Sequence, residues 1–327
     1  MQLEKVFVTR RIPEKGLEML RKECIVNIWP GDLPPTPDEL KKEAAGAAGI
    51  LSLLTDRIDA AVMDAAGSGL KVISNYAVGY DNIDLSEAAR RGIAVGNTPG
   101  VLTEATADHS FALLMAAARR VAEGDRQVRA GEWRTWEPMG LLGADIHGAT
   151  LGLVGFGRIG QAMARRAAGF GMKVLYYDPE YQDSDNVPGN AASTSLEKVL
   201  AESDFVSIHV PLTDQTRRMF NHTSLNQMKT GAILINTSRG GVVDQGALYD
   251  VLKSGHLSAA GIDVTEPEPL PKDSLLLTLE NLVITPHIAS ASRSTRERMA
   301  VMAAENLLAG IKDELLPNQV NLAAHRT

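Results

Sequence analysis

Short apolar runs alternate with amphipathic segments over most of the chain. KVFVT, CIVNIW and GILSLL are three such runs, and each precedes a stretch whose apolar residues recur with the period of a helix. Buried strands of a parallel sheet have this form, because helices cover both faces of the sheet. Thr36 before Pro37, with Glu39 soon after, predicts a helix that starts with a capping box. The N-terminal part is therefore expected to be a doubly wound α/β domain.

The pattern changes after the segment NTPG. Residues 103–133 have helical periodicity throughout and predict one helix of about 25 residues, which is long for a compact domain. Strand and helix alternate again from ATLGLVGFGRIG onwards, whereas the final helical stretch, 294–310, has no strand left to serve there. We expect that stretch to return to the first domain. The fold class is then α/β, with two doubly wound parallel-sheet domains: residues 1–99 and 288–327 form one, and residues 100–287 are inserted into it.

Composition narrows the class of protein. The 327 residues are 44% hydrophobic and 22% charged, as in an ordinary globular protein, and the length suits two domains. A net charge of −7 without a basic block argues against binding to nucleic acid or to an anionic membrane. The single cysteine, Cys24, excludes an internal disulfide and is expected to be a small buried hydrophobe.

Targeting signals are missing from the apolar pattern. The first apolar run is too short for a secretory signal, and no run approaches the roughly 18 residues that a membrane-spanning helix needs. We therefore expect a cytoplasmic protein.

The segment LGLVGFGRIG places Gly155, Gly157 and Gly160 in the spacing G-x-G-x-x-G. An apolar strand enters the motif and a helical pattern leaves it, which is the context of a dinucleotide-binding turn. The three glycines permit, in order, the tight turn, the approach of a pyrophosphate and the close packing of helix on strand. The helix N-terminus favours the phosphates, and Arg158 can add a cation. We expect residues 100–287 to be an NAD-binding Rossmann domain and the rest a flavodoxin-like substrate-binding domain.

An acid follows the next predicted strand, KVLYYD, which ends in Asp178. A carboxylate at this position can accept hydrogen bonds from the adenine ribose hydroxyls and would repel a 2′-phosphate. The neighbouring Pro179 and Glu180 add no compensating base. The sequence therefore favours NADH as cofactor and leaves NADPH as the alternative.

Polar side chains follow three of the later predicted strands. Arg239 follows GAILINTS, Glu268 follows AAGIDV, and His287 follows NLVITP. Ligands of open parallel sheets bind beyond the carboxyl ends of the strands, so all three side chains could face one crevice. A histidine after a strand is, taken alone, more often a packed core residue. Its position with the arginine and the glutamate favours a catalytic role.

These three residue types suit the reduction of a 2-oxo acid. An arginine can hold the carboxylate and polarise the carbonyl group, because its planar guanidinium stays charged at any working pH. A histidine titrates near neutrality and can protonate the oxygen as hydride reaches C2. A neighbouring carboxylate would stabilise the imidazolium form and fix the tautomer of the ring.

Several segments together resemble the D-isomer-specific 2-hydroxyacid dehydrogenases over nearly the whole chain. They are VGYDNID at 78–84, GFGRIG at 155–160, NTSRGGVVD at 236–244, DVTEPEPLP at 263–271 and TPHIASAS at 285–292. The resemblance implies that Arg239, Glu268 and His287 are the catalytic set. Other segments, including GEWRTWEP, are most similar to glyoxylate/hydroxypyruvate reductases. A small 2-oxo acid or 2-hydroxy acid is the substrate that this resemblance implies.

The resemblance also implies further contacts. Substrate contacts are expected from Leu54, Val78, Gly79 and Ser290, and Trp136 resembles a tryptophan that reaches into the partner subunit's active site of a homodimer. Cofactor contacts are expected from Arg158, Ile159, Val210, Pro211, Thr237, Asp263 and Ala289, with Asp263 near the nicotinamide amide. Asp178 departs from mammalian relatives that use NADPH.

Two other activities are compatible with the sequence. A D-lactate or 3-phosphoglycerate dehydrogenase is one alternative, and an NAD-sensing corepressor that binds peptides is another. The histidines other than His287 have no metal-ligand spacing and are expected to be structural, so we expect no metal site. The preferred acid and the direction of the reaction do not follow from the sequence.

Overall fold

The computed structural model describes residues 3–181 and 187–321. It divides into two compact units. Unit 1 comprises Met1–Leu102 and Ala291–Thr327, and unit 2 comprises Thr103–Ser290. Each unit has its own parallel sheet. The α/β class and the insertion of one parallel-sheet domain into another are as the apolar pattern predicts.

Unit 1 is built on a parallel sheet that, among the described residues, has five strands in the order β2-β1-β3-β4-β5. The strands are β1 (Glu4–Val8), β2 (Cys24–Ile28), β3 (Gly49–Ser52), β4 (Val72–Asn75) and β5 (Ala94–Gly96). The helices are α1 (Glu14–Glu23), α2 (Pro37–Ala44), α3 (Ala60–Ala66), α4 (Leu85–Arg90) and α11 (Arg293–Ile311). The central strands β3 and β4 are buried throughout, which is why they are apolar on both faces.

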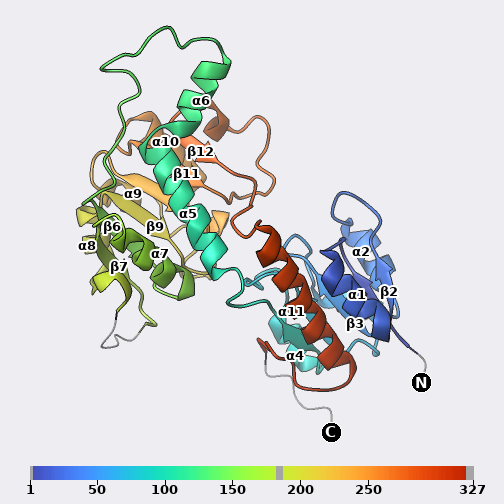
Figure 1. Cartoon of the computed structure of the whole chain (residues 1–327). Helices are drawn as coiled ribbons and strands as arrows, with labels where there is room; N and C mark the ends of the chain where they lie inside the picture. The colour runs from blue at the N-terminus through green and yellow to red at the C-terminus, as the bar shows by residue number, and fades with distance from the viewer. Residues whose placement is uncertain (1–2, 182–186, 322–327) are drawn as a thin grey trace. The chain divides into compact units, whose positions relative to one another are not determined.

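Three predictions about unit 1 are confirmed. The capping box of α2 is present: Thr36 N–H donates to Glu39 Oε2 at 2.8 Å, and Glu39 N–H donates to Thr36 Oγ1 at 3.4 Å. A cap of this kind typically stabilises a helix by about 1 kcal/mol. The C-terminal helix α11 packs against α1 and against β3 and β4, so chain segments from the two ends of the sequence lie side by side (Figure 1). Cys24 is also buried, as expected.

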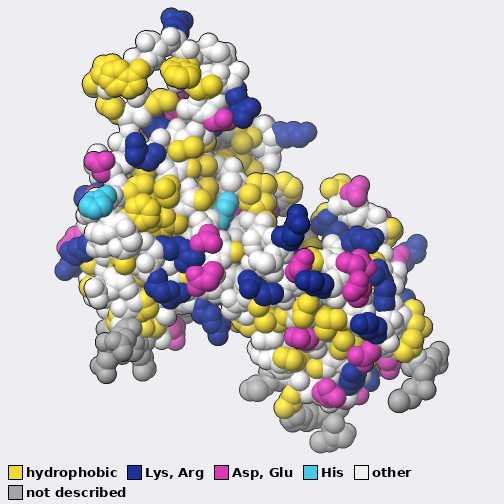
Figure 2. All heavy atoms as spheres, viewed as in Figure 1, with side chains coloured by type: hydrophobic (Ala, Val, Ile, Leu, Met, Phe, Trp, Pro, Cys, Tyr) yellow, Lys and Arg dark blue, Asp and Glu magenta, His cyan; other side chains and the backbone are white. Residues whose placement is uncertain are grey.

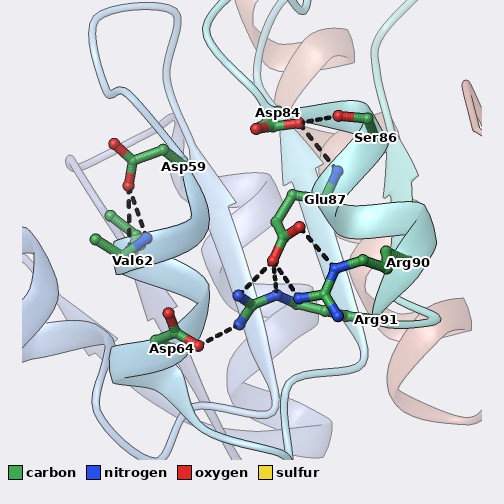
Figure 3. Close-up of polar contacts among 9 residues, drawn as sticks. Asp59, Val62, Asp64, Asp84, Ser86, Glu87, Arg90 and Arg91 are labelled. Atoms are coloured by element: carbon green, nitrogen blue, oxygen red, sulfur yellow. Dashed lines mark hydrogen bonds and ion pairs between the residues drawn. The ribbon is translucent and has the colours of Figure 1, made fainter.

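A cluster of charged side chains ties α3 to α4 (Figure 3). Arg91 donates from Nη1 to Asp64 Oδ1 and from Nε to Glu87 Oε1, each at 2.6 Å. Arg90 reaches the same glutamate in a bidentate arrangement, at 2.9 and 2.6 Å. Hydrogen bonds from Arg90 and then Arg91 lower the pKa of Glu87 to about 2. The cluster links α3 to α4 at the surface of unit 1.

Unit 2 is built on a parallel sheet that, in the described part of the chain, has seven strands in the order β12-β11-β10-β9-β6-β7-β8. The strands are β6 (Thr150–Val154), β7 (Lys173–Tyr177), β8 (Ala192–Ser193), β9 (Phe205–Ile208), β10 (Ile233–Asn236), β11 (Ala259–Ile262) and β12 (Leu282–Ile284). The helices are α5 (Thr103–Ala118), α6 (Val121–Arg129), α7 (Arg158–Ala168), α8 (Leu196–Glu202), α9 (His222–Gln227) and α10 (Gln245–Lys253). Short 3-10 turns occupy Pro188–Asn190, Gly240–Val242 and Leu275–Thr278.

The two faces of this sheet carry separate cores. Along β10, Leu234 belongs to the cluster that includes α8, α9 and α10, whereas Ile233 and Ile235 belong to the cluster that includes α5 and α7. Successive side chains of a strand point to opposite faces, so this alternation is required by strand geometry. Figure 1 shows α5 and α7 on one face of the sheet. This placement brings α5 near the strand ends that carry the candidate site.

The prediction of one long helix over 103–133 is wrong. The helix α5 ends at Ala118, and α6 begins at Val121, with Arg120 between them in the left-handed conformation at φ 51°. Ala144 N–H donates to the carbonyl oxygen of Ala118 at 2.8 Å. That carbonyl is therefore engaged by a distant segment instead of by the next turn of a helix. A bond to a residue so far along the chain leaves no trace in local periodicity.

Candidate active site

Three neighbouring strands end at the candidate site. In the sheet, β11 lies between β10 and β12, and the register aligns Asn236 with Ile262 and Ile262 with Ile284. The strands are parallel, so the segments that follow them leave the same edge of the sheet. These segments carry Arg239, Glu268 and His287.

His287 and Glu268 form a close pair. His287 Nδ1 lies 2.9 Å from Glu268 Oε2, and the other carboxylate oxygen of Glu268 accepts a hydrogen bond from Thr265 N–H at 3.0 Å. The side chains are 23% and 31% exposed. The ring is therefore not a packed core residue. Of the two interpretations open to the sequence, the structure favours a histidine that is accessible and held by a carboxylate.

Arg239 lies after β10 in a turn that its own neighbours organise. Asn236 is buried at the end of the strand, and its Nδ2 donates to the carbonyl oxygen of Arg239 at 2.9 Å. The Oδ1 atom of the same asparagine accepts from Ser238 N–H at 3.0 Å and from Ser238 Oγ at 2.9 Å. The guanidinium is part-buried and donates from Nη1 to Ser238 O at 2.9 Å. The backbone that presents Arg239 is thus fixed by a buried amide.

Asp263 organises the segment that carries His287. Its Oδ1 accepts from Thr285 Oγ1 at 2.5 Å and from Ile288 N–H at 2.8 Å, and its Oδ2 accepts from Ala289 N–H at 2.7 Å. Its carbonyl oxygen accepts from His287 N–H at 2.9 Å. Burial would raise the pKa of this carboxyl, but hydrogen bonds from His109, Thr285 and the two backbone N–H groups hold the pKa below its ordinary value.

Sequence reasoning missed two residues of α5 that reach this edge of the sheet. His109 Nε2 lies 2.9 Å from Thr285 Oγ1, and Ser110 Oγ lies 2.7 Å from Thr237 Oγ1. The partners are 176 and 127 positions away in the chain. No spacing rule connects positions so distant. The only local signal is that polar residues interrupt an otherwise apolar helix.

The glycine-rich turn joins β6 to α7. Gly155 has φ +96°, a conformation that favours glycine, and its N–H donates to Tyr177 O at 2.9 Å. A Cβ on Gly160 would fall 2.3 Å from the carbonyl oxygen of Gly155, so helix and turn touch there. Gly157 caps α7 without a side-chain hydrogen bond, and a Cβ on it would meet no atom within 4 Å. The first N–H groups of α7 are open to a phosphate, and the turn therefore fits a dinucleotide.

Asp178 follows β7 and faces this turn. Its Oδ2 accepts from Phe156 N–H at 2.7 Å, and its Oδ1 accepts from Glu180 N–H at 2.9 Å and from Tyr181 N–H at 3.2 Å. The carboxylate therefore ties the glycine-rich turn to the end of β7. It is part-buried, so it keeps a face that is open to a ligand.

The other predicted cofactor residues lie along the same edge of the unit 2 sheet. Val210 is buried after β9, and the carbonyl oxygen of Pro211 accepts from Thr216 Oγ1 at 2.6 Å. Thr237 and Ala289 are buried after β10 and β12. Arg158 and Ile159 start α7, where Arg158 is exposed and Ile159 is part-buried.

The predicted substrate residues are divided between the units. Leu54, Val78 and Gly79 lie in unit 1, in the segments that follow β3 and β4, and all three are part-buried. Ser290 and Trp136 lie in unit 2, and Trp136 is 80% exposed. Exposed hydrophobic side chains gather over α6 and the segment after it (Figure 2).

The described residues contain no candidate metal site and no candidate membrane span. No group of three or more histidine, cysteine, aspartate or glutamate side chains there could hold a metal ion. No helix in the same part of the chain has the length and the apolar content needed to cross a membrane.

The fold and the turn together define a class of protein. A parallel sheet in which a glycine-rich turn opens a helix, and an acid follows the next strand, is the arrangement of a dinucleotide-binding α/β protein. Comparison with known proteins makes the assignment specific. Residues 111–289 match the family model of the D-isomer specific 2-hydroxyacid dehydrogenase, NAD binding domain. The chain belongs to this family of oxidoreductases, which work with a nicotinamide cofactor.

Individual relatives extend the similarity over nearly the whole chain. The chain is 54% identical over 318 residues to a glyoxylate reductase of Korarchaeum cryptofilum, and the match covers 97% of this chain and 96% of that one. A crystal structure of a Thermus thermophilus protein superposes with a TM-score of 0.91 at 52% identity, covering 97% and 99% of the two chains. An NADPH-dependent glyoxylate/hydroxypyruvate reductase of Sinorhizobium meliloti, solved with NADP and malonate, superposes with a TM-score of 0.85 at 31% identity, covering 98% and 97%.

Proposed function

We propose that the protein reduces glyoxylate to glycolate and hydroxypyruvate to D-glycerate. The observation that carries the proposal is the 2.9 Å contact between His287 Nδ1 and Glu268 Oε2, on segments that follow neighbouring strands. The strand beside them, β10, leads to Arg239. The similarity to proteins named glyoxylate reductase supports the choice of substrate.

Arg239 binds the acid in this proposal. Its guanidinium offers paired N–H donors to the substrate carboxylate and polarises the neighbouring carbonyl group. The amide of Asn236 holds the backbone of this turn, so the guanidinium starts from a fixed position.

His287 supplies the proton. A carboxylate can only accept hydrogen bonds, so the contact with Glu268 requires the proton of the pair to be on His287 Nδ1. The exchangeable proton of the imidazolium is then on Nε2, which is free to protonate the carbonyl oxygen of the substrate. The glycine-rich turn of Gly155, Gly157 and Gly160 would hold a reduced nicotinamide cofactor, which would supply a hydride to C2 of the substrate. Glu268 stabilises the charged ring before the transfer and fixes its orientation.

The proposal is tested by the oxidation of NADH in the presence of either 2-oxo acid. We expect turnover with both, and a panel of 2-oxo acids that includes pyruvate ranks them by kcat/KM. His287→Ala should lower kcat by about 10²- to 10⁴-fold, the usual range for loss of a general acid. Arg239→Ala should raise KM and lower kcat together, because substrate and transition state both use the guanidinium.

His222 provides the matched control. It lies in the same unit, is exposed, and has a carboxylate 3.4 Å away on Asp250, yet it is not at the strand ends. His222→Ala should leave kcat unchanged. A protein that binds NADH but turns over neither acid, or a His287→Ala variant as active as the wild type, would refute the proposal.

We propose further that NADH is preferred to NADPH. The carboxylate of Asp178 is anchored by three backbone N–H groups beside the glycine-rich turn, and Glu180 is exposed next to it. A 2′-phosphate would meet negative charge there. We expect kcat/KM to be at least about tenfold higher with NADH, and Asp178→Ser should narrow that ratio. Glu180→Gln serves as the control, and equal use of the two cofactors by the wild type would contradict this preference.

We also infer that two copies of the chain form a homodimer through the exposed apolar segment of unit 2. Val121, Val128, Trp133, Trp136 and Met139 are each more than half exposed. Burial of such side chains against a second copy would remove a large apolar surface from water. Size-exclusion chromatography with light scattering should give the mass of a dimer. The double substitution Trp136→Ser and Val128→Ser should weaken the association of the two copies. A monomeric wild type would overturn this inference.

A further inference from the structure

One helix touches the ends of three strands through two consecutive residues. His109 of α5 reaches Thr285 after β12, and its Nε2 also lies 3.4 Å from Asp263 Oδ1 after β11. The next residue, Ser110, reaches Thr237 after β10. These are the strands whose following segments carry His287, Glu268 and Arg239. The helix therefore contacts every segment that carries a member of the proposed catalytic set.

The direction of each hydrogen bond in this network follows from the chemistry of its members. The buried carboxylate of Asp263 can only accept, so Thr285 Oγ1 donates its single proton to Asp263 Oδ1. Thr285 Oγ1 must then accept from His109 Nε2. His109 consequently carries a proton on Nε2, whichever state its Nδ1 is in. The order of donation is His109 to Thr285 to Asp263.

The end of this chain of hydrogen bonds supports the backbone around His287. Asp263 accepts the N–H groups of Ile288 and Ala289 with its side chain and the N–H of His287 with its carbonyl oxygen. His287 itself has φ 54°, a left-handed conformation that is unfavourable for a residue with a side chain. Such a conformation persists only where surrounding contacts over-determine it. The three hydrogen bonds to Asp263 are those contacts.

We propose that His109 is a positioning residue for the reduction: by donating to Thr285 Oγ1 it orients Thr285 and Asp263, and through them the backbone that presents His287. The inference depends on the function proposed above. His109 does not take part in the proton transfer, because its ring is bound to Thr285 and Asp263. Its contribution is to the alignment of a reacting group, and small misalignments cost rate.

Two substitutions separate a positioning role from a packing role. His109→Leu fills much of the same space without a donor and should lower kcat about 10- to 100-fold, with little change in KM. His109→Gln can place an amide N–H near the position of Nε2 and should recover most of the lost rate. His109→Asn has the same amide on a shorter stem that does not reach Thr285, so it should behave like the leucine variant.

A second measurement does not depend on activity, and its first part uses the wild-type protein alone. In wild-type protein without cofactor, ¹⁵N spectra of the imidazole groups should show His109 protonated on Nε2, with slow exchange of that proton. Thr285→Val keeps the shape of the side chain but removes both the acceptor and the donor. It should speed the exchange of the Nε2 proton and perturb the resonances of His287.

The outcomes are distinguishable. If the wild type reduces 2-oxo acids but His109→Leu keeps wild-type kcat, the positioning role is refuted and the proposed function stands. Equal kcat for the glutamine and leucine variants, or a His109 ring without a proton on Nε2, would also refute it. A wild type without turnover overturns the proposed function and the positioning role with it.

Discussion

Each unit holds a buried aspartate just beyond the carboxyl end of a strand, and the two behave in opposite ways. Asp56 in unit 1 is 3% exposed and Asp263 in unit 2 is 1% exposed. Burial raises the pKa of Asp56 more than its hydrogen bonds from Thr9, Leu53 and Thr55 and the charge of Arg10 lower it. The pKa of Asp263 is lowered despite burial, because its hydrogen bonds outweigh the desolvation.

The donors explain the difference. Asp56 has one backbone N–H, that of Leu53 at 2.8 Å, together with the hydroxyl groups of Thr9 and Thr55. Asp263 has two backbone N–H groups and the hydroxyl of Thr285 as donors, and His109 Nε2 lies 3.4 Å from its Oδ1. Hydrogen bonds to the charged form favour ionisation, and burial disfavours it. Although both carboxyl groups are buried, the ionised form is favoured in Asp263 and disfavoured in Asp56.

Replacing Asp263 should produce the largest effect. In Asp263→Asn the amide NH₂ group would face either Ala289 N–H or Ile288 N–H, and a backbone N–H cannot accept a hydrogen bond from it. We expect the free energy of unfolding to fall by about 3 kcal/mol and kcat to fall about 100-fold or more. Urea denaturation and steady-state kinetics measure both. A variant within threefold of wild-type kcat would show that the carboxylate does not fix the backbone around His287.

Low pH should remove from the wild-type protein the contribution that ionised Asp263 makes to the free energy of unfolding. The folded-state pKa of Asp263 is below its ordinary value of 3.8, so its stabilising contribution is present above that value and is lost as pH falls through the folded pKa. The stability gap between wild type and Asp263→Asn should therefore narrow below about pH 4. Denaturation curves of both proteins across this range test the prediction. A gap that stays constant into strong acid would contradict it.

Unit 1 also has a clamp of neutral amides, and its contribution to stability should not depend on pH as that of Asp263 does. Asn82 Nδ2 donates to the carbonyl oxygens of Leu53 at 3.0 Å and Asp56 at 2.9 Å, and Asn75 Nδ2 donates to Gly79 O at 2.8 Å. Asn82→Ala should lower the free energy of unfolding by about 1–2 kcal/mol, because carbonyl groups lose their donors. The loss should depend little on pH, since the amide and carbonyl groups of the clamp do not titrate. A loss that varies with pH would mean that charge contributes to the clamp.

The features that the sequence predicts depend on residues that are close together in the chain. Arg239, Glu268 and His287 were predicted as a set because each follows an apolar strand, and an apolar strand can be recognised from local pattern. The turn at Gly155 is likewise local, since strand, glycines and helix are adjacent in the chain. Both depend on residues close in sequence, where period and composition carry information.

The parts that the sequence missed depend on distant partners. The helix break at Arg120 follows no glycine or proline, and the contact that accompanies it is the hydrogen bond from Ala144 to Ala118. The role of His109 depends on Thr285, which is 176 positions away. The directions in which the pKa values of Asp56 and Asp263 are shifted depend on burial and on hydrogen-bond donors that folding brings to each carboxyl group. None of these partners is specified by spacing along the chain.

Replacing Asp56 should give the smallest effect and the clearest contrast with Asp263. Both strong donors, Thr9 Oγ1 and Leu53 N–H, act on Oδ2, and the one hydrogen bond to Oδ1 from the described residues comes from the Thr55 hydroxyl at 3.3 Å. An asparagine can place its amide oxygen where Oδ2 of Asp56 lies. Its NH₂ group then takes the place of Oδ1 and can donate to the Thr55 hydroxyl, which is able to accept. Asp56→Asn therefore keeps an acceptor for both strong donors.

The sign of its effect on stability follows from the raised pKa. An unfolded Asp56 ionises at the ordinary value of 3.8, while the folded group ionises only at higher pH, so stability is lost as pH rises between these two values. The loss persists at neutral pH. Asp56→Asn removes it and should make the free energy of unfolding equal to or up to about 1 kcal/mol greater than wild type at pH 7, with no gain near pH 4. If Asp56→Asn were destabilised as strongly as Asp263→Asn, the fold would depend on the negative charge of Asp56 as well as on that of Asp263. The prediction that ionised Asp56 is unfavourable would then be wrong.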